Sequence, residues 1–150
     1  MEHDPGTAEA LRVVEDVAKE TMEEGRARIT VERSDGGWFI SLIPANPRAC
    51  AVSLTADYPP QIDMFLGPEP TTASYEFWRD SWPENLTLLR DLLEAVIAGR
   101  YEQTIDKRRR GLTVTGRFDL PAGEHTHSET GRAPEGLGSR EPYVLHFEPY

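Results

Sequence analysis

A single change in hydrophobic period, near Gly25, most constrains what this chain can fold into. Before it, apolar side chains recur at three- and four-residue steps from about Thr7 to Glu24, the pattern of an amphipathic helix. After it, apolar and polar side chains alternate through residues 27–32, the pattern of a strand with one solvent-exposed face. The sequence therefore predicts an N-terminal helix followed directly by a strand.

Short turns divide the next forty residues into further strands. Asp35-Gly36-Gly37 is typical of a tight hairpin. The run from Trp38 to Ile43 is apolar on both faces apart from Ser41, which indicates a central strand. Two more strands are expected at residues 50–54 and 62–66. Successive short strands with short connections favour an antiparallel meander of four strands.

A second helix is expected to begin at Ser81, which has capping-box spacing to Glu84. Its leucine-rich stripe ends near Gly99, and strands are predicted at 101–105 and 112–120. Residues 121–142 hold almost no large apolar side chain, so a mobile loop is predicted there, and the last eight residues again read as a strand. These patterns predict one α+β domain over residues 1–150: an antiparallel sheet of the four-strand meander plus two or three C-terminal strands, with both helices on one face.

The net charge of the chain restricts the classes of partner that it can bind. The chain carries 26 acidic and 16 basic residues, a net charge of −10. Such a protein repels phosphate backbones and anionic lipid, so neither nucleic acid nor membrane is expected as a partner, whereas a basic protein would be steered toward it. The first five residues lack the features of a signal peptide, and a cytoplasmic location is predicted. The oligomeric state is left open.

No catalytic constellation stands out. Cys50, the only cysteine, lies in register with Val52 and Leu54, which indicates a small core residue instead of a nucleophile. No glycine-rich phosphate loop and no nucleophile elbow occurs. The sequence therefore predicts no catalytic residue, metal or cofactor, and favours a protein that is not an enzyme.

One alternative uses histidines. His125 and His127 lie two residues apart and can share an ion, and His146 can supply a third nitrogen. A metal-dependent enzyme or small-ligand-binding protein follows from that interpretation. A ligand groove between the sheet and the helices, lined by Trp38 and the phenylalanines Phe39 and Phe65, is a further alternative.

Aromatic residues cluster before the second helix, and we expect Tyr75, Phe77, Trp78 and Trp82 to bind a partner. Aromatic side chains dominate interface hot spots, and this cluster falls in an expected connection between elements. The competing interpretation is that these rings pack the second helix onto the sheet. The favoured function is a non-catalytic protein–protein interaction module, for example an immunity-type or adaptor protein that binds a basic partner.

The segment Leu54-Thr-Ala-Asp-Tyr58-Pro59-Pro60-Gln-Ile62 resembles the junction of the third and fourth strands in RWD domains and ubiquitin-conjugating enzymes. The preceding order of one helix and three strands is similar too, so the resemblance covers residues 7–66. No His-Pro-Asn motif follows, and no cysteine after Cys50 takes the place of the conjugating cysteine. The resemblance implies an RWD-like interaction domain without transfer chemistry.

Overall fold

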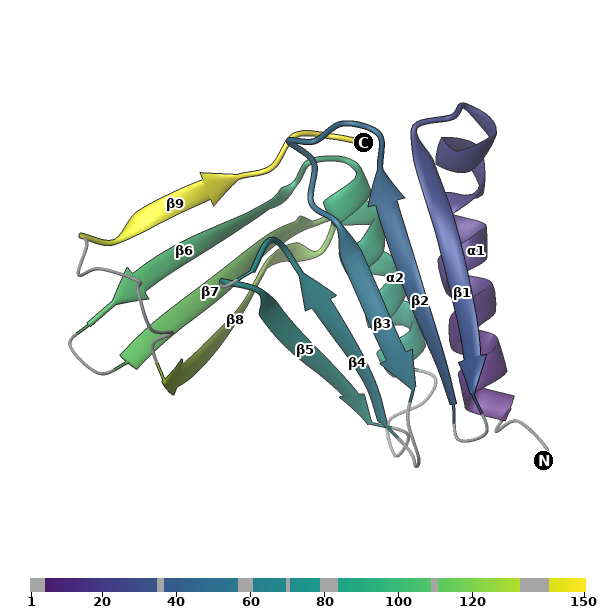
Figure 1. Ribbon diagram of the computed structural model, residues 1–150, viewed down its shortest axis with the longest axis horizontal. Helices are drawn as coiled ribbons and strands as arrows, with labels where there is room; N and C mark the ends of the chain where they lie inside the picture. The colour runs from purple at the N-terminus through teal and green to yellow at the C-terminus, as the bar shows by residue number, and fades with distance from the viewer. Residues whose placement is uncertain are drawn as a thin grey trace.

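The computed structural model describes residues 5–34, 37–56, 61–69, 71–78, 84–108, 111–132 and 141–150; for residues 5–7, Ser34 and Trp78 it describes the backbone alone. Two helices and nine strands occur in these ranges (Figure 1). In chain order they are α1 (Pro5–Glu23), β1 (Ala27–Ser34), β2 (Gly37–Pro44), β3 (Val52–Ala56), β4 (Gln61–Leu66), β5 (Ala73–Trp78), α2 (Glu84–Ile97), β6 (Tyr101–Lys107), β7 (Gly111–Leu120), β8 (Gly123–Arg132) and β9 (Tyr143–His146).

The strands form two antiparallel sheets, one of five strands in the order β1-β2-β3-β4-β5 and one of four in the order β8-β7-β6-β9. The predicted α+β class with antiparallel pairing is confirmed. The prediction of one sheet is wrong in two respects. The meander continues into a fifth strand, β5, and the strands after α2 pair among themselves.

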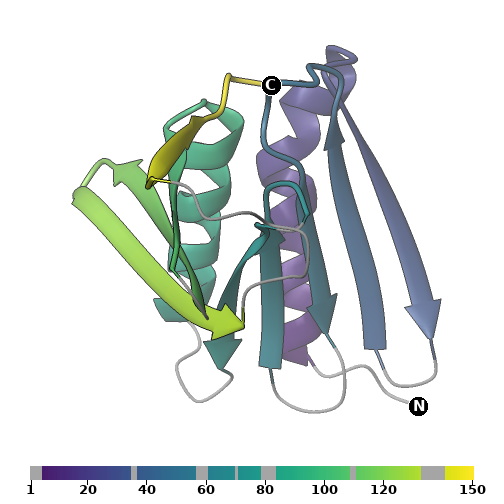
Figure 2. The same ribbon diagram turned by 60° about the vertical axis from the view of Figure 1, so that its left-hand side comes forward.

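Both helices lie on the same side of the five-stranded sheet, behind it in Figure 1, as the sequence predicted. They contact each other, and α2 also contacts β5 and β7, so this helix joins the two sheets (Figure 2). We call the helix side of the five-stranded sheet its inner face and the opposite side its outer face.

The core follows from the alternation of each strand. In β3 and β4 every second side chain is buried, and the residues that share the inner face include Leu54 and Met64, which are fully buried. From α2, the leucine stripe that contains Leu89 and Leu93 packs into the same cluster. Burial of each such side chain stabilises the fold by about 1.5–3 kcal/mol.

A buried glutamine links the two sheets. Gln103 on β6 is fully buried, and its Nε2 donates to the carbonyl oxygen of Leu66, at the end of β4, at 2.9 Å and to the hydroxyl of Tyr101 at 2.8 Å. Gly67 makes the approach feasible, because a Cβ at this position would lie 2.7 Å from Gln103 Nε2. Its φ of +86° also favours glycine over any other residue.

The C-terminal strand returns to a sheet edge, as predicted, and pairs with β6. Beyond it, the Tyr150 hydroxyl donates to the Cys50 carbonyl at 2.6 Å, and the Tyr150 amide donates to the Ile97 carbonyl at 3.0 Å. These bonds tie the chain end to α2 and to the connection between β2 and β3.

The predicted mobile loop at 121–142 is wrong for its first half, because residues 123–132 form β8; residues 133–140 lie outside the described part of the chain. This strand pairs with β7 along its whole length. It needs few apolar residues, because hydroxyl pairs stabilise one of its faces: Thr113 with Thr130 at 2.9 Å and Thr115 with Ser128 at 2.8 Å. In the ranges that the structure covers, neither helix has the length and apolar character needed to cross a membrane.

Candidate functional site

The described part of the predicted aromatic cluster lies on a strand instead of a connection. Tyr75 and Phe77 belong to β5, and their rings are 4.9 Å apart. Phe77 is fully buried, so its ring packs in the core, and the competing interpretation of the cluster holds for this residue. The Trp78 side chain and all of Trp82 lie outside the described residues.

Where β8 crosses the edge of β5, polar side chains connect the two sheets. The Tyr75 hydroxyl lies 2.9 Å from His125 Nε2, and the His127 ring centroid lies 4.6 Å from that of Tyr75. Glu129 accepts hydrogen bonds from the Ser74 amide at 3.0 Å and the Ser74 hydroxyl at 2.6 Å. Because β5 is an edge strand, this carboxylate satisfies an amide that has no neighbouring strand to bind.

Burial lowers the pKa of His125 below its ordinary value, and the nearby His127 lowers it further. Burial also raises the pKa of the Tyr75 hydroxyl. Both shifts favour neutral groups, and a neutral imidazole nitrogen can accept the hydroxyl proton of Tyr75. The crossing thus functions as a structural contact between sheets.

The three histidines of the metal interpretation do not meet. The register places His146 beside Glu102, Arg117 and Thr126 on one face of the four-stranded sheet, whereas His125 and His127 occupy the opposite face. Across the described ranges, no three His, Cys, Asp or Glu side chains are grouped so that they could hold a metal ion.

The face that carries His146 is a network of exposed charges. Arg117 contacts Glu102 at 2.6 Å and Glu124 at 3.4 Å, and His146 Nδ1 lies 3.1 Å from Glu102. Exposed pairs of this kind contribute about 0–1 kcal/mol each. Positive and negative side chains are paired with each other in this network, so it does not form a patch of one charge that would attract a ligand of the opposite charge.

The outer face of the five-stranded sheet was not predicted as a binding surface, although two of its residues, Phe39 and Phe65, were predicted to line a groove. Neither helix covers it (Figure 1). Phe39 of β2 points to this side and is 37% exposed, while its neighbour Trp38 points inward and is 6% exposed. The predicted groove lined jointly by Trp38, Phe39 and Phe65 is therefore wrong, because Trp38 and Phe39 lie on opposite faces.

Phe39 and Phe65 instead line an open hollow of about 590 Å³ on the outer face, which we call the outer-face hollow. Most of the other lining residues are small, among them Ser53 of β3. Its lining residues are Phe39, Ala51, Ser53, Phe65, Gly67, Glu69, Thr72 and Ser74. Two aromatic rings beside small residues therefore form a partly apolar depression on this face, which also carries the exposed Ile43 of β2.

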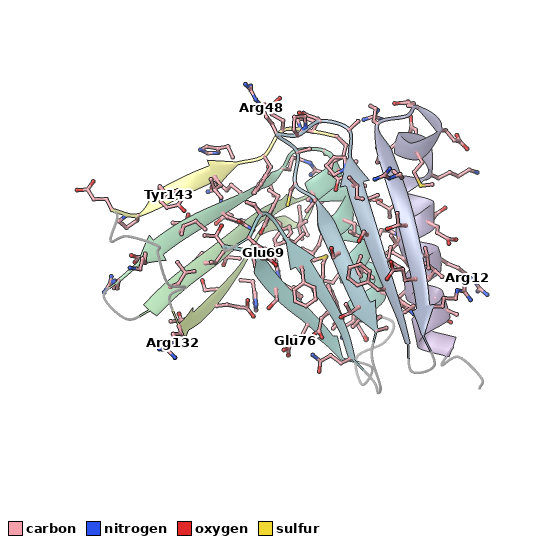
Figure 3. All side chains as sticks on the ribbon, viewed as in Figure 1. Arg12, Arg48, Glu69, Glu76, Arg132 and Tyr143 are labelled. Atoms are coloured by element: carbon pink, nitrogen blue, oxygen red, sulfur yellow. The ribbon has the colours of Figure 1, made fainter. Side chains whose placement is uncertain are left out.

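Acidic residues lie in and near this hollow. Glu69 lies in its rim, and Asp63 and Glu76 are opposite each other on β4 and β5 on the same face. Figure 3 shows Glu69 and Glu76 on the side of the sheet away from the helices. Among the described strand residues of the outer face, Arg28 is the only basic one. The hollow therefore lies in a field of predominantly negative charge.

Comparison with known proteins adds no relative: no family model, curated protein or solved structure matches this chain. The resemblance to RWD domains stays a prediction, and its turn at residues 57–60 lies outside the described part of the chain. The interpretation of Cys50 as a core residue is confirmed, since the thiol is fully buried and burial raises its pKa to about 12.

Proposed function

We propose that this chain is a non-catalytic binding module that holds a basic protein partner in its outer-face hollow. The observation that carries the proposal is an exposed aromatic ring, Phe39, beside carboxylates on a sheet face that no helix covers. Aromatic anchors surrounded by polar groups are the usual composition of an interface hot spot.

Apolar contact and charge would have separate roles. Phe39 and Phe65 supply area that loses water when a partner side chain enters the hollow. Asp63, Glu69 and Glu76 attract a basic partner from a distance, which raises the association rate more than the affinity. The net charge of −10 acts in the same direction.

The test compares wild type with four variants as bait in lysate of the cells that make the protein. Phe39→Ala removes the exposed anchor, and Glu69→Lys reverses a rim charge. The matched controls are Val144→Ala, an apolar residue that is 44% exposed on β9 of the other sheet, and Glu94→Lys on the exposed side of α2. Circular dichroism and urea unfolding establish that all four variants are folded.

A partner retained by wild type and both controls, bound about tenfold or more weakly by Phe39→Ala, supports the proposal. For Glu69→Lys the expected change is slower association and a smaller effect of salt. Equal retention by all variants, or an eluate without a stoichiometric partner, would overturn it. An immunity protein for a basic toxin and an adaptor are two forms of this function, and the identity of the partner distinguishes them.

A further inference from the structure

The five-stranded sheet has one long open edge, β1. At the other end of that sheet, Glu129 reaches the edge of β5. In the second sheet one edge strand, β9, has only four residues, and the other, β8, has ten but contacts β5 through His125 and Glu129. β1 has eight residues and forms the outer margin of the molecule in Figure 2, with α1 lying toward the middle of the sheet. Long uncovered edges are surfaces on which another strand can pair.

The backbone groups available at this edge are identified by the hydrogen bonds to β2. The Ala45 amide donates to the Arg26 carbonyl at 2.8 Å, so the backbone of Arg26 faces β2. N–H and C=O of one residue point to the same side of a strand, and the side alternates along the chain. The backbone of Ile29 and Val31 therefore faces the open edge, while that of Thr30 faces β2.

The sequence Arg28-Ile29-Thr30-Val31-Glu32 is complementary to itself when read in the opposite direction. An antiparallel copy with Thr30 opposite Thr30 places Arg28 opposite Glu32 and Ile29 opposite Val31, each pair twice. Ile29 and Val31 are also the residues whose backbone groups face the edge, so they would exchange the hydrogen bonds. A shift of two residues either way places Arg28 opposite Ser34 or Thr30 and loses its pairing with Glu32.

The side chains of this edge suit such a pairing. Arg28 and Glu32 are exposed on the outer face. On the inner face Val31 is 39% exposed, and Met22 of α1, which lines a groove with Ile29, is 40% exposed. Cross-strand pairing would shield these apolar side chains from water and bring opposite charges together.

We propose that β1 pairs with β1 of a second copy, antiparallel about Thr30, to give a symmetric dimer with one continuous sheet. Each ion pair and each apolar pair then occurs twice, as two-fold symmetry requires. The occupant of this edge is thus a second copy of the chain, and the inference is independent of the partner proposed for the outer-face hollow.

The test uses charge reversal and sedimentation velocity over a range of concentrations. Wild type is expected to sediment as a dimer. Arg28→Glu alone and Glu32→Arg alone place like charges opposite each other twice per dimer, so each should raise the dimer Kd about tenfold or more. The double variant R28E/E32R restores both ion pairs and should dimerise as wild type does. Glu94→Arg on α2 is the control for an altered net charge and should leave the dimer intact.

Mixing the two single variants gives the sharpest result. In a mixed dimer, the introduced glutamate of R28E would face the introduced arginine of E32R. The unaltered Arg28 of one chain would face the unaltered Glu32 of the other, so an equimolar mixture should dimerise although neither variant does alone. A wild type that stays monomeric at the highest soluble concentration, or single variants that dimerise as well as wild type, would overturn the proposal. Partner binding through Phe39 would be unaffected by either of those outcomes, so the two proposals fail separately.

Discussion

Replacing Phe77 with Ala separates the core and interface interpretations of the aromatic segment. Its ring has no exposed surface and packs against Tyr75 on the inner side. Truncation removes the buried ring and leaves a cavity, which together cost about 3–5 kcal/mol. Against a typical domain stability of about 5–15 kcal/mol this is a large loss. With a urea dependence of about 2 kcal/mol per molar, the unfolding midpoint should fall by about 2 M.

The matched control is Phe39→Ala on the outer face. The same atoms are removed, but Phe39 is 37% exposed, and the site can fill with water instead of leaving a void. The expected loss is about 1 kcal/mol or less. Urea unfolding followed by far-ultraviolet circular dichroism measures both variants under one set of conditions.

The two substitutions should also differ in binding. Partner binding by Phe77→Ala should decline only in proportion to the unfolded fraction, whereas Phe39→Ala should bind weakly while fully folded. An unchanged urea midpoint for Phe77→Ala, combined with a loss of binding, would refute the core assignment. It would place the Phe77 ring at a surface, as the sequence alone suggested.

Three further predictions follow from individual contacts. The pKa of His125 in the folded protein lies below its ordinary value of 6.5, so His125 of the unfolded chain takes up a proton first as the pH falls. The contribution of His125 to folding stability is therefore complete above pH 6.5 and declines as the pH falls below 6.5. In thermal unfolding, His125→Gln should lose less stability on acidification than wild type does. Burial raises the pKa of the Cys50 thiol to about 12, so an aromatic disulfide reagent that reacts with thiolates should label Cys50 at neutral pH only as fast as the protein unfolds. Rapid labelling in native buffer would contradict the burial of Cys50. Gly67→Ala places a Cβ against Gln103 at a residue whose φ is +86°, so it should lower the free energy of unfolding in urea by about 1–3 kcal/mol. The control Gly131→Ala, where a Cβ would meet nothing within 4 Å, should lower it less.

The elements predicted correctly are those whose pattern is local. The alternation at 27–32 and at 62–66 reflects a sheet with one face on the helices, and both strands were expected close to their observed bounds. The leucine stripe of α2 likewise requires only the helical period. In each case the buried side chains are apolar and regularly spaced, so the sequence alone indicates which face of the element is buried.

The strands that were missed depend on contacts distant in sequence. β8 contains no large apolar residue; it is held by the backbone of β7, by hydroxyl pairs and by Tyr75, which precedes His125 by fifty positions. A polar strand of this kind has the composition of a loop until its neighbours are known. The aromatic residues of β5 were expected in a connection, although Tyr75 and Phe77 alternate with the polar residues Ser74 and Glu76.

The candidate site was only partly predicted, for a related reason: Phe39 and Phe65 were expected to line a groove, but the face that they share was not identified. Phe39 and Ile43 alternate with the inward residues of β2, and an apolar pattern on both faces was taken to mean burial on both. The neighbouring strand β3 carries the better signal, because its outer-face residues Ser53 and Thr55 are small and polar, which is typical of a face without a covering layer. Which face the helices occupy is a tertiary property, and pairing between strands had to be known before Phe39 could be assigned to the open one.

The two proposals combine in a way that sets the stoichiometry of binding. Antiparallel pairing of β1 with β1 of a second copy places the two-fold axis perpendicular to the sheet, so both outer faces lie on the same side. A dimer would then present two outer-face hollows to one partner surface, and a partner with two basic segments would gain from binding both at once. The charge-reversed variant Arg28→Glu should therefore bind such a partner more weakly than wild type, yet bind a single basic segment equally well. Because Phe39→Ala weakens both interactions, calorimetric titration of the two ligands against the two variants separates an effect on the hollow from an effect on the dimer.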